Sequence, residues 1–100
     1  MHTNSVEEDV KQKIISLVSA LVPNAKIYLF GSRARKTHGP RSDIDIALDA
    51  GHELERVMVG EVRDILNASN IPYKIDVVDF YGVSDDMRQF IDKEKIVWKS

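Results

Sequence analysis

Apolar side chains recur every three or four positions along the first part of the chain, which is the spacing of one face of an α-helix. These positions are Val6, Val10, Ile14, Leu17, Val18 and Leu21. Ser5 and Glu8 stand three residues apart, as in a capping box, and Pro23 follows the last apolar position. The pattern therefore predicts an amphipathic helix over residues 5–22 that packs its apolar face into the core.

The rest of the chain alternates between strand patterns and helix patterns. Short runs rich in β-branched and aromatic residues predict four strands, at residues 26–30, 43–49, 73–80 and 95–98. Helical spacing and turn signals predict three further helices, at residues 32–36, 53–69 and 84–92, and Ser84 is the expected cap of the last one. This alternation is typical of an α/β (α+β) domain, and we expect a small mixed β-sheet flanked by helices, with the last strand as a candidate edge.

Length and composition narrow the class of protein. A chain of 100 residues with 43% hydrophobic and 30% charged side chains is typical of one small globular domain, expected to span residues 1–100. The formal charge of −2 provides no basic stripe, so strong binding to long nucleic acid is not expected. No apolar run is long enough to span a membrane. The absence of cysteine excludes disulfides and thiolate metal sites and is compatible with a cytoplasmic protein.

Three aspartates fall on predicted strands, where aspartate is uncommon. Asp43 and Asp45 alternate with Ile44 and Ile46, so the two carboxylates share one face, and Asp76 stands in the middle of a later strand. Neighbouring carboxylates repel each other, and a divalent cation that prefers oxygen ligands, Mg²⁺ or Mn²⁺, removes that cost. The pattern therefore favours a metal site; the alternative is that these are surface acids on a hydrated sheet face.

A tight turn precedes the acidic pair. Phe30 ends a buried strand, and Gly31 and Ser32 begin a short helix. Main-chain N–H groups and a serine hydroxyl at such a turn are suited to phosphate oxygens. A plain turn with a helix cap is the alternative for Gly31 and Ser32 taken alone. Next to a carboxylate pair the phosphate interpretation is favoured, and the two features together suggest a site for a nucleoside triphosphate.

Other charged residues near these motifs are given no part in the chemistry. Asp79 lies at the end of its strand, opposite in parity to Asp76, and we interpret it as a solvated or turn residue. Arg33 is expected to face solvent or an interface. The loop residues Lys36, His38 and Arg41 are interpreted as solvated charges, and His38 has no histidine or cysteine at ligand spacing.

Gly31-Ser32, a spacer of ten residues and Asp43-Ile44-Asp45-Ile46 together resemble the signature of the nucleotidyltransferase superfamily related to DNA polymerase beta. The form Gly-Ser-x-Ala-Arg, followed by Ser-Asp-Ile-Asp-Ile, is similar to that of its shortest branch, the minimal nucleotidyltransferases. The resemblance extends over most of the chain and implies the polymerase beta-like nucleotidyltransferase fold.

The resemblance implies catalytic and metal-binding roles for the three acids. Asp43, Asp45 and Asp76 would bind metal, with two Mg²⁺ ions expected and Mn²⁺ as a substitute. Asp76 could also accept the proton of the attacking hydroxyl.

The resemblance also implies a nucleotide-binding set. Gly31 and Ser32 would hold the β- and γ-phosphates of ATP, the default substrate of the family. Arg35 stands where the family pattern has its arginine and could neutralise triphosphate charge. Ser42 would either cap the start of the strand or touch phosphate.

Finally, the resemblance implies a partner. In the minimal branch the theme is a helical HEPN-type protein in a toxin–antitoxin pair, with the nucleotidyltransferase as antitoxin and, in some members, AMP transferred to a tyrosine of the partner. We therefore expect metal-dependent transfer of AMP from ATP to a hydroxyl of a HEPN-type partner within a heteromeric complex; a homodimer is also compatible with the sequence. Two alternatives stay open: a non-catalytic module that neutralises its partner by contact, and a stand-alone enzyme acting on a small molecule.

Overall fold

A computed structural model describes residues 6–100 of the chain. The described residues form eight elements: α1 (Glu8–Leu21), β1 (Lys26–Phe30), α2 (Ser32–Arg35), β2 (Ile44–Asp49), α3 (Arg56–Ala68), β3 (Ile75–Asp79), α4 (Asp85–Glu94) and β4 (Ile96–Lys99). Each predicted helix and strand is present, and its ends differ from the predicted ones by no more than three residues.

Serine caps are predicted at the starts of α1 and α4. Ser84 caps α4 as expected, because its hydroxyl oxygen accepts a hydrogen bond of 3.2 Å from the N–H of Met87. The predicted cap of α1, Ser5, lies outside the described residues. In the structure Glu7 holds the capping position of α1, and its side chain does not cap the helix.

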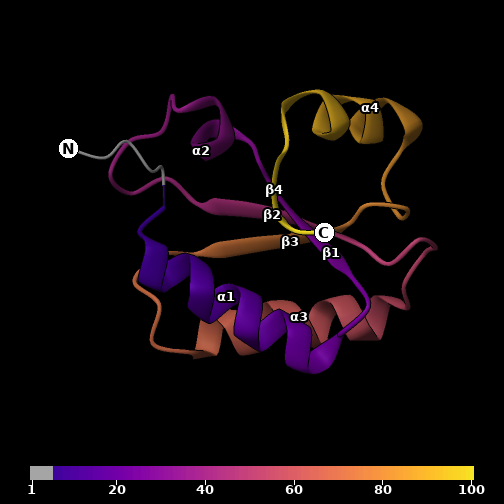
Figure 1. The fold of residues 1–100 in the computed structure, drawn as a ribbon, viewed down its shortest axis with the longest axis horizontal. Coiled ribbons are helices and arrows are strands. Elements are labelled where there is room, and N and C mark those ends of the chain that lie inside the picture. Colours follow the sequence, from indigo (N-terminus) through magenta and orange to yellow (C-terminus); the bar gives the residue numbers. More distant parts are fainter. Residues whose placement is uncertain (1–5) are drawn as a thin grey trace.

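The strands form one mixed sheet in the order β3-β2-β1-β4. β1 pairs antiparallel with β2 and with β4, and β2 pairs parallel with β3. The prediction of a small mixed sheet is therefore confirmed, as is the edge position of β4. In Figure 1, α1 and α3 lie on one side of this sheet, and α2 and α4 lie on the other.

The alternation of side chains along the strands divides the core in two. The larger cluster faces α1 and α3 and includes the fully buried side chains Ile14, Val18, Ile27, Ile46, Leu48, Leu66, Ile75 and Val77. The smaller cluster lies on the α4 side and consists of Tyr28, Phe30, Ala47, Phe80 and Ile91. Because Asp45 and Asp76 differ by an even number of residues from Ala47 and Phe80, they lie on this second, more thinly covered side of the sheet.

The outer edge of β3 is occupied by side chains of α3. The amide of Asn67 donates to the carbonyl oxygen of Ile75 (2.8 Å) and accepts from its N–H (3.0 Å). Arg63 donates to the carbonyl oxygen of Val77 (3.0 Å). These bonds hold α3 against the edge strand and fix where β3 begins.

A search of residues 6–100 for a helix with the length and apolar character needed to cross a bilayer finds none.

Candidate active site

Two of the three predicted acids face each other across the parallel strand pair. Asp45 of β2 and Asp76 of β3 are register partners, so their side chains project from the same face of the sheet. Asp45 is partly buried and Asp76 is exposed. Asp43 immediately precedes β2, rather than lying within it as predicted, and its side chain is also exposed.

The acids influence each other electrostatically. The pKa of Asp45 is raised to about 6, chiefly by burial and also by the negative charges of Asp76 and Asp43. The positive charge of Arg35 opposes this increase in the pKa of Asp45, and Glu94 adds to it. The structure therefore places Asp43 and Asp76 within electrostatic reach of Asp45, in an arrangement that a cation would stabilise.

The acids do not form a preformed metal cage. Among residues 6–100, no three histidine, cysteine, aspartate or glutamate side chains are oriented so that they could hold a metal ion as they stand. The donor set nevertheless fits a divalent cation, because Asp43 and Asp76 are exposed and can turn toward the partly buried Asp45. Their carboxylate oxygens are the hard donors that Mg²⁺ and Mn²⁺ prefer.

The turn at Gly31 lies directly against Asp45. Gly31 has a φ of 79° and a ψ of −158°, a conformation that is essentially restricted to glycine. A Cβ atom at this position would overlap the carboxylate of Asp45 and lie 3.2 Å from its Cγ. The predicted phosphate-binding turn and the acidic pair are therefore neighbours in space as well as in sequence.

The N–H of Gly31 is already hydrogen-bonded. It donates to Oε2 of Glu94 at 2.6 Å, and Nη1 of Arg35 forms an ion pair of 2.9 Å with Oε1 of the same carboxylate. Sequence reasoning missed Glu94. One signal could have identified it, since an acid in the last turn of a helix opposes the helix dipole and needs a partner elsewhere.

Arg33 is buried, so the expectation that it faces solvent or an interface is wrong. Only 3% of the residue is exposed. Its Nε and Nη2 donate to the carbonyl oxygen of Ser42 at 3.1 and 2.9 Å, and its guanidinium lies 4.5 Å from the ring centroid of Tyr73. Arg33 thereby holds the main chain immediately before Asp43.

The hydroxyl of Ser42 is used inside its own loop. Its oxygen accepts a hydrogen bond of 2.9 Å from the N–H of Gly39. Together with the bonds that Arg33 makes to the Ser42 carbonyl oxygen, this contact shapes the loop that leads from α2 to β2.

Comparison with known proteins identifies the family. Residues 12–100 match the sequence model described as polymerase beta, nucleotidyltransferase. The chain belongs to this nucleotidyltransferase family.

Two curated relatives carry the same name. A probable protein adenylyltransferase MntA of Haemophilus influenzae is 26% identical over 99 residues, which are 95% of this chain and 87% of the relative. The protein adenylyltransferase MntA of Shewanella oneidensis is 34% identical over 90 residues, which cover 88% of this nucleotidyltransferase and 64% of the relative. The chain thus spans less than two thirds of the Shewanella protein.

Solved structures support the same fold. A crystal structure of a toxin–antitoxin with AMP-PNP has a TM-score of 0.77 and 32% identity, covering 88% of this chain and 71% of the compared one. A tri-AMPylated Shewanella oneidensis HEPN toxin in complex with its MNT antitoxin has a TM-score of 0.74 and 29% identity, with 93% and 71% coverage. The polymerase beta-like fold predicted from the sequence is therefore confirmed for this nucleotidyltransferase.

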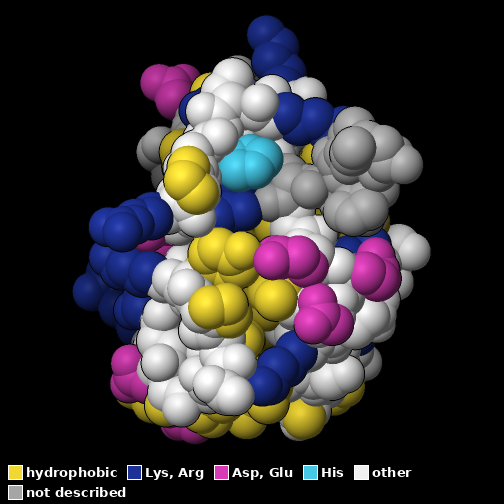
Figure 2. Space-filling model, turned by 90° about the vertical axis from the view of Figure 1, so that its left-hand side faces the viewer, with side chains coloured by type: hydrophobic (Ala, Val, Ile, Leu, Met, Phe, Trp, Pro, Cys, Tyr) yellow, Lys and Arg dark blue, Asp and Glu magenta, His cyan; other side chains and the backbone are white. Residues whose placement is uncertain are grey.

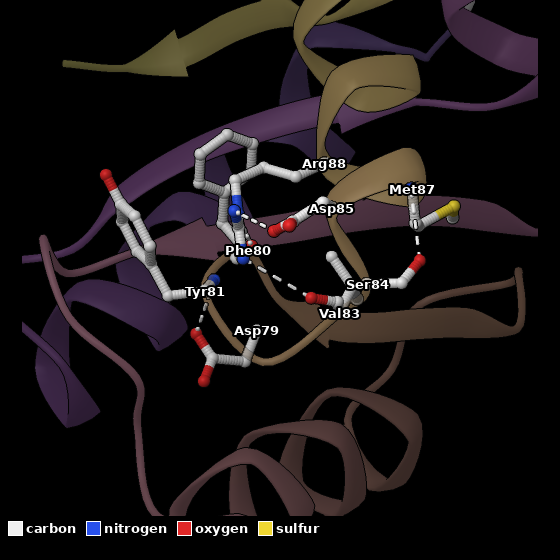
Figure 3. Close-up of polar contacts among 8 residues, drawn as sticks. All are labelled: Asp79, Phe80, Tyr81, Val83, Ser84, Asp85, Met87 and Arg88. Atoms are coloured by element: carbon white, nitrogen blue, oxygen red, sulfur yellow. Dashed lines mark hydrogen bonds and ion pairs between the residues drawn. The ribbon is translucent and has the colours of Figure 1, made fainter.

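In this nucleotidyltransferase the helix that carries Glu94 is anchored at its other end. Arg88 donates to the carbonyl oxygens of Phe80 (3.0 Å) and Val83 (3.4 Å) and forms an ion pair of 2.9 Å with Asp85. Figure 3 shows how these contacts draw together the loop between β3 and α4. The start of α4 is thus held by several bonds.

Asp79 also differs from its prediction as a solvated residue. It is buried, and its carboxylate accepts hydrogen bonds from the N–H groups of Leu54 (2.7 Å) and Tyr81 (3.3 Å). The bond to Tyr81 agrees with the alternative interpretation as a turn residue. The bond to Leu54 ties the loop before α3 to the end of β3, so the role of Asp79 is structural.

Figure 2 shows the face of the nucleotidyltransferase next to α2 and the start of α1. Lys and Arg side chains gather at one flank and Asp and Glu side chains at the other, with hydrophobic side chains between them. Among the residues coloured on this face, no continuous basic band crosses the surface.

Proposed function

We propose that this nucleotidyltransferase transfers AMP from ATP to a hydroxyl group of a HEPN-type partner protein and acts as the antitoxin of that pair. The observation that carries the proposal is the juxtaposition of Asp45 and Asp76 directly beneath the Gly31 turn. The relatives named protein adenylyltransferase MntA, and the neighbouring structure of an AMPylated HEPN toxin with its antitoxin, supply the chemical class of the acceptor.

The acids would act at the reacting phosphate. Asp43, Asp45 and Asp76 would hold one or two divalent cations, Mg²⁺ or Mn²⁺, which when bound neutralise phosphate charge and orient the triphosphate. In the transfer, the acceptor oxygen forms a bond to the α-phosphorus of ATP, the bond from that phosphorus to the bridging oxygen breaks, and pyrophosphate leaves. The exposed carboxylate of Asp76 would accept the proton of the hydroxyl.

The turn would hold the other end of the nucleotide. The N–H of Gly31 and the neighbouring hydroxyl of Ser32 would donate to phosphate oxygens, and Arg35, whose side chain is 45% exposed, would offset their charge. The hydroxyl oxygen of Ser42 accepts a hydrogen bond from the N–H of Gly39, and its O–H would donate to a phosphate oxygen. The proposal includes a cytoplasmic location, where ATP is supplied.

Intact-mass spectrometry tests the proposal. The protein is mixed with ATP, Mg²⁺ and the product of the adjacent gene, and the partner is expected to gain the mass of one or more AMP groups. Asp43→Asn should abolish this gain with the fold intact, because it removes a carboxylate that would hold the cation and whose side chain is exposed. Asp64→Asn is the matched control, since Asp64 is an exposed acid on α3, on the other side of the sheet.

The same experiment distinguishes the alternative. A stable complex without mass gain under any of the four nucleoside triphosphates would overturn the transferase proposal and favour neutralisation by contact. Unchanged transfer by Asp43→Asn would refute the assignment of the acids.

A further inference from the structure

Two of the groups proposed to meet the triphosphate, the N–H of Gly31 and the guanidinium of Arg35, are engaged by one carboxylate. The N–H of Gly31 donates to Oε2 of Glu94 at 2.6 Å, and Arg35 donates to Oε1 at 2.9 Å. Charge-assisted hydrogen bonds of this length are among the stronger ones in proteins. Each oxygen of Glu94 therefore takes a position that a phosphate oxygen would need.

Glu94 is held in this place by those contacts and not by its helix. Its side chain is only 12% exposed. It lies at the C-terminal end of α4, where the helix dipole disfavours a negative charge. It also raises the pKa of Asp45, so the two negative charges destabilise each other. Gly31 and Arg35 must compensate for both unfavourable effects.

Glu94 can withdraw without unfolding its helix. The start of α4 is fixed by Arg88 and Ser84, and its middle is fixed by the fully buried Ile91. Glu94 is the last helical residue, and the next residue, Lys95, is already extended. A rotation of the Glu94 side chain alone therefore frees the N–H of Gly31.

We propose that Glu94 is an internal competitor for the nucleotide, and that ATP binds only when the Glu94 carboxylate releases Gly31 and Arg35. This inference rests on the proposed function, because it concerns the same triphosphate site. One N–H cannot serve the carboxylate and a phosphate oxygen fully at once, and a triphosphate repels a carboxylate in the same place. The apparent dissociation constant is then the intrinsic value divided by the fraction of molecules in which Glu94 has withdrawn.

Binding of α,β-methylene ATP with Mg²⁺, measured by calorimetry, tests the inference, because this analogue cannot transfer AMP. Glu94→Gln and Glu94→Ala are expected to bind the analogue about tenfold more tightly than wild type does. This factor corresponds to a wild-type protein in which Glu94 occupies the phosphate site in about nine of ten molecules. Asp92→Asn is the matched control and should bind as wild type does. It removes one negative charge from the same helix, where Asp92 pairs with Lys95 instead of the turn.

Equal or weaker binding by both Glu94 variants would overturn the inference. It would mean that Glu94 helps binding by positioning the Arg35 side chain for the nucleotide. Nuclear magnetic resonance adds a readout without nucleotide: the amide proton of Gly31 should shift upfield in Glu94→Ala, and an unchanged shift would also refute the contact. The proposed function fails separately, if wild type binds the analogue but never modifies the partner. Absence of binding by every variant would refute both.

Discussion

The close approach of Gly31 to Asp45 makes the substitution Gly31→Ala a stringent test of the site geometry. Two costs add. The backbone, with a φ of 79°, is strained for any residue with a Cβ, at about 1–3 kcal/mol. The new methyl group would also overlap the Asp45 carboxylate, and displacing a packed side chain costs about 1–3 kcal/mol more.

The cost of the overlap with Asp45 can be separated from the backbone strain by comparison with a second glycine of similar φ. Gly51 has a φ of 84°, but a Cβ there would meet no atom within 4 Å, so Gly51→Ala carries the strain alone. We expect Gly31→Ala to lower the free energy of unfolding by about 2–6 kcal/mol, and Gly51→Ala by about 1–3 kcal/mol. For a domain of this size, each kcal/mol lowers the unfolding temperature by about 4–8 °C.

Thermal unfolding followed by circular dichroism measures both variants, alone and combined with Asp45→Ala. Removing the Asp45 carboxylate should lower the extra cost of Gly31→Ala toward that of Gly51→Ala, which is the coupling expected of groups in contact. If the cost of Gly31→Ala is the same with and without the carboxylate, the two groups do not meet and the reasoning is refuted. Transfer activity should be lost in Gly31→Ala, because Asp45 is displaced from Asp76.

Two further predictions concern Asp45 and Arg33. In metal-free protein Asp45→Asn should raise the unfolding temperature at about pH 7.5 and have little effect at about pH 4. The folded-state pKa of Asp45, about 6, lies above its ordinary value of 3.8, so the stability contributed by the protonated carboxyl is present at low pH and is lost as the pH rises through 6; an equal effect at both pH values would contradict this. Arg33→Lys should lower the free energy of unfolding in urea by about 1–3 kcal/mol, because an ammonium cannot replace the two bonds to the Ser42 carbonyl oxygen and the stacking on Tyr73. An unchanged urea midpoint would show that the buried guanidinium contributes nothing to the free energy of unfolding.

Much of the fold could be predicted because its signals are local. The period of apolar residues identified each helix and strand, and Ser84 marked the start of α4. Alternation along each strand also indicates the face on which Asp45 and Asp76 lie, but that the two residues are register partners comes from the pairing of β2 with β3.

The errors lie where contacts join distant parts of the chain. The local pattern around Arg33 indicates a surface position, yet the side chain is buried against Tyr73 and the carbonyl of Ser42. Glu94 reaches Gly31 across 63 positions of sequence. Asp79 is buried because it accepts an N–H from Leu54 in the loop before α3. The spacing of apolar residues predicts helices and strands but not the contacts of a single charged side chain. Its partner is identified only from the three-dimensional structure.

The bonds that Asn67 and Arg63 make to the edge of β3 also bear on self-association. A sheet with two open edges can add copies of itself at both sides and grow into a fibre. Here α3 occupies main-chain groups of Ile75 and Val77 on one edge, so among the described strands a further strand is more readily added at β4. Two chains that pair through β4 would bury their open edges against each other, and such an assembly closes at two copies instead of growing into a filament.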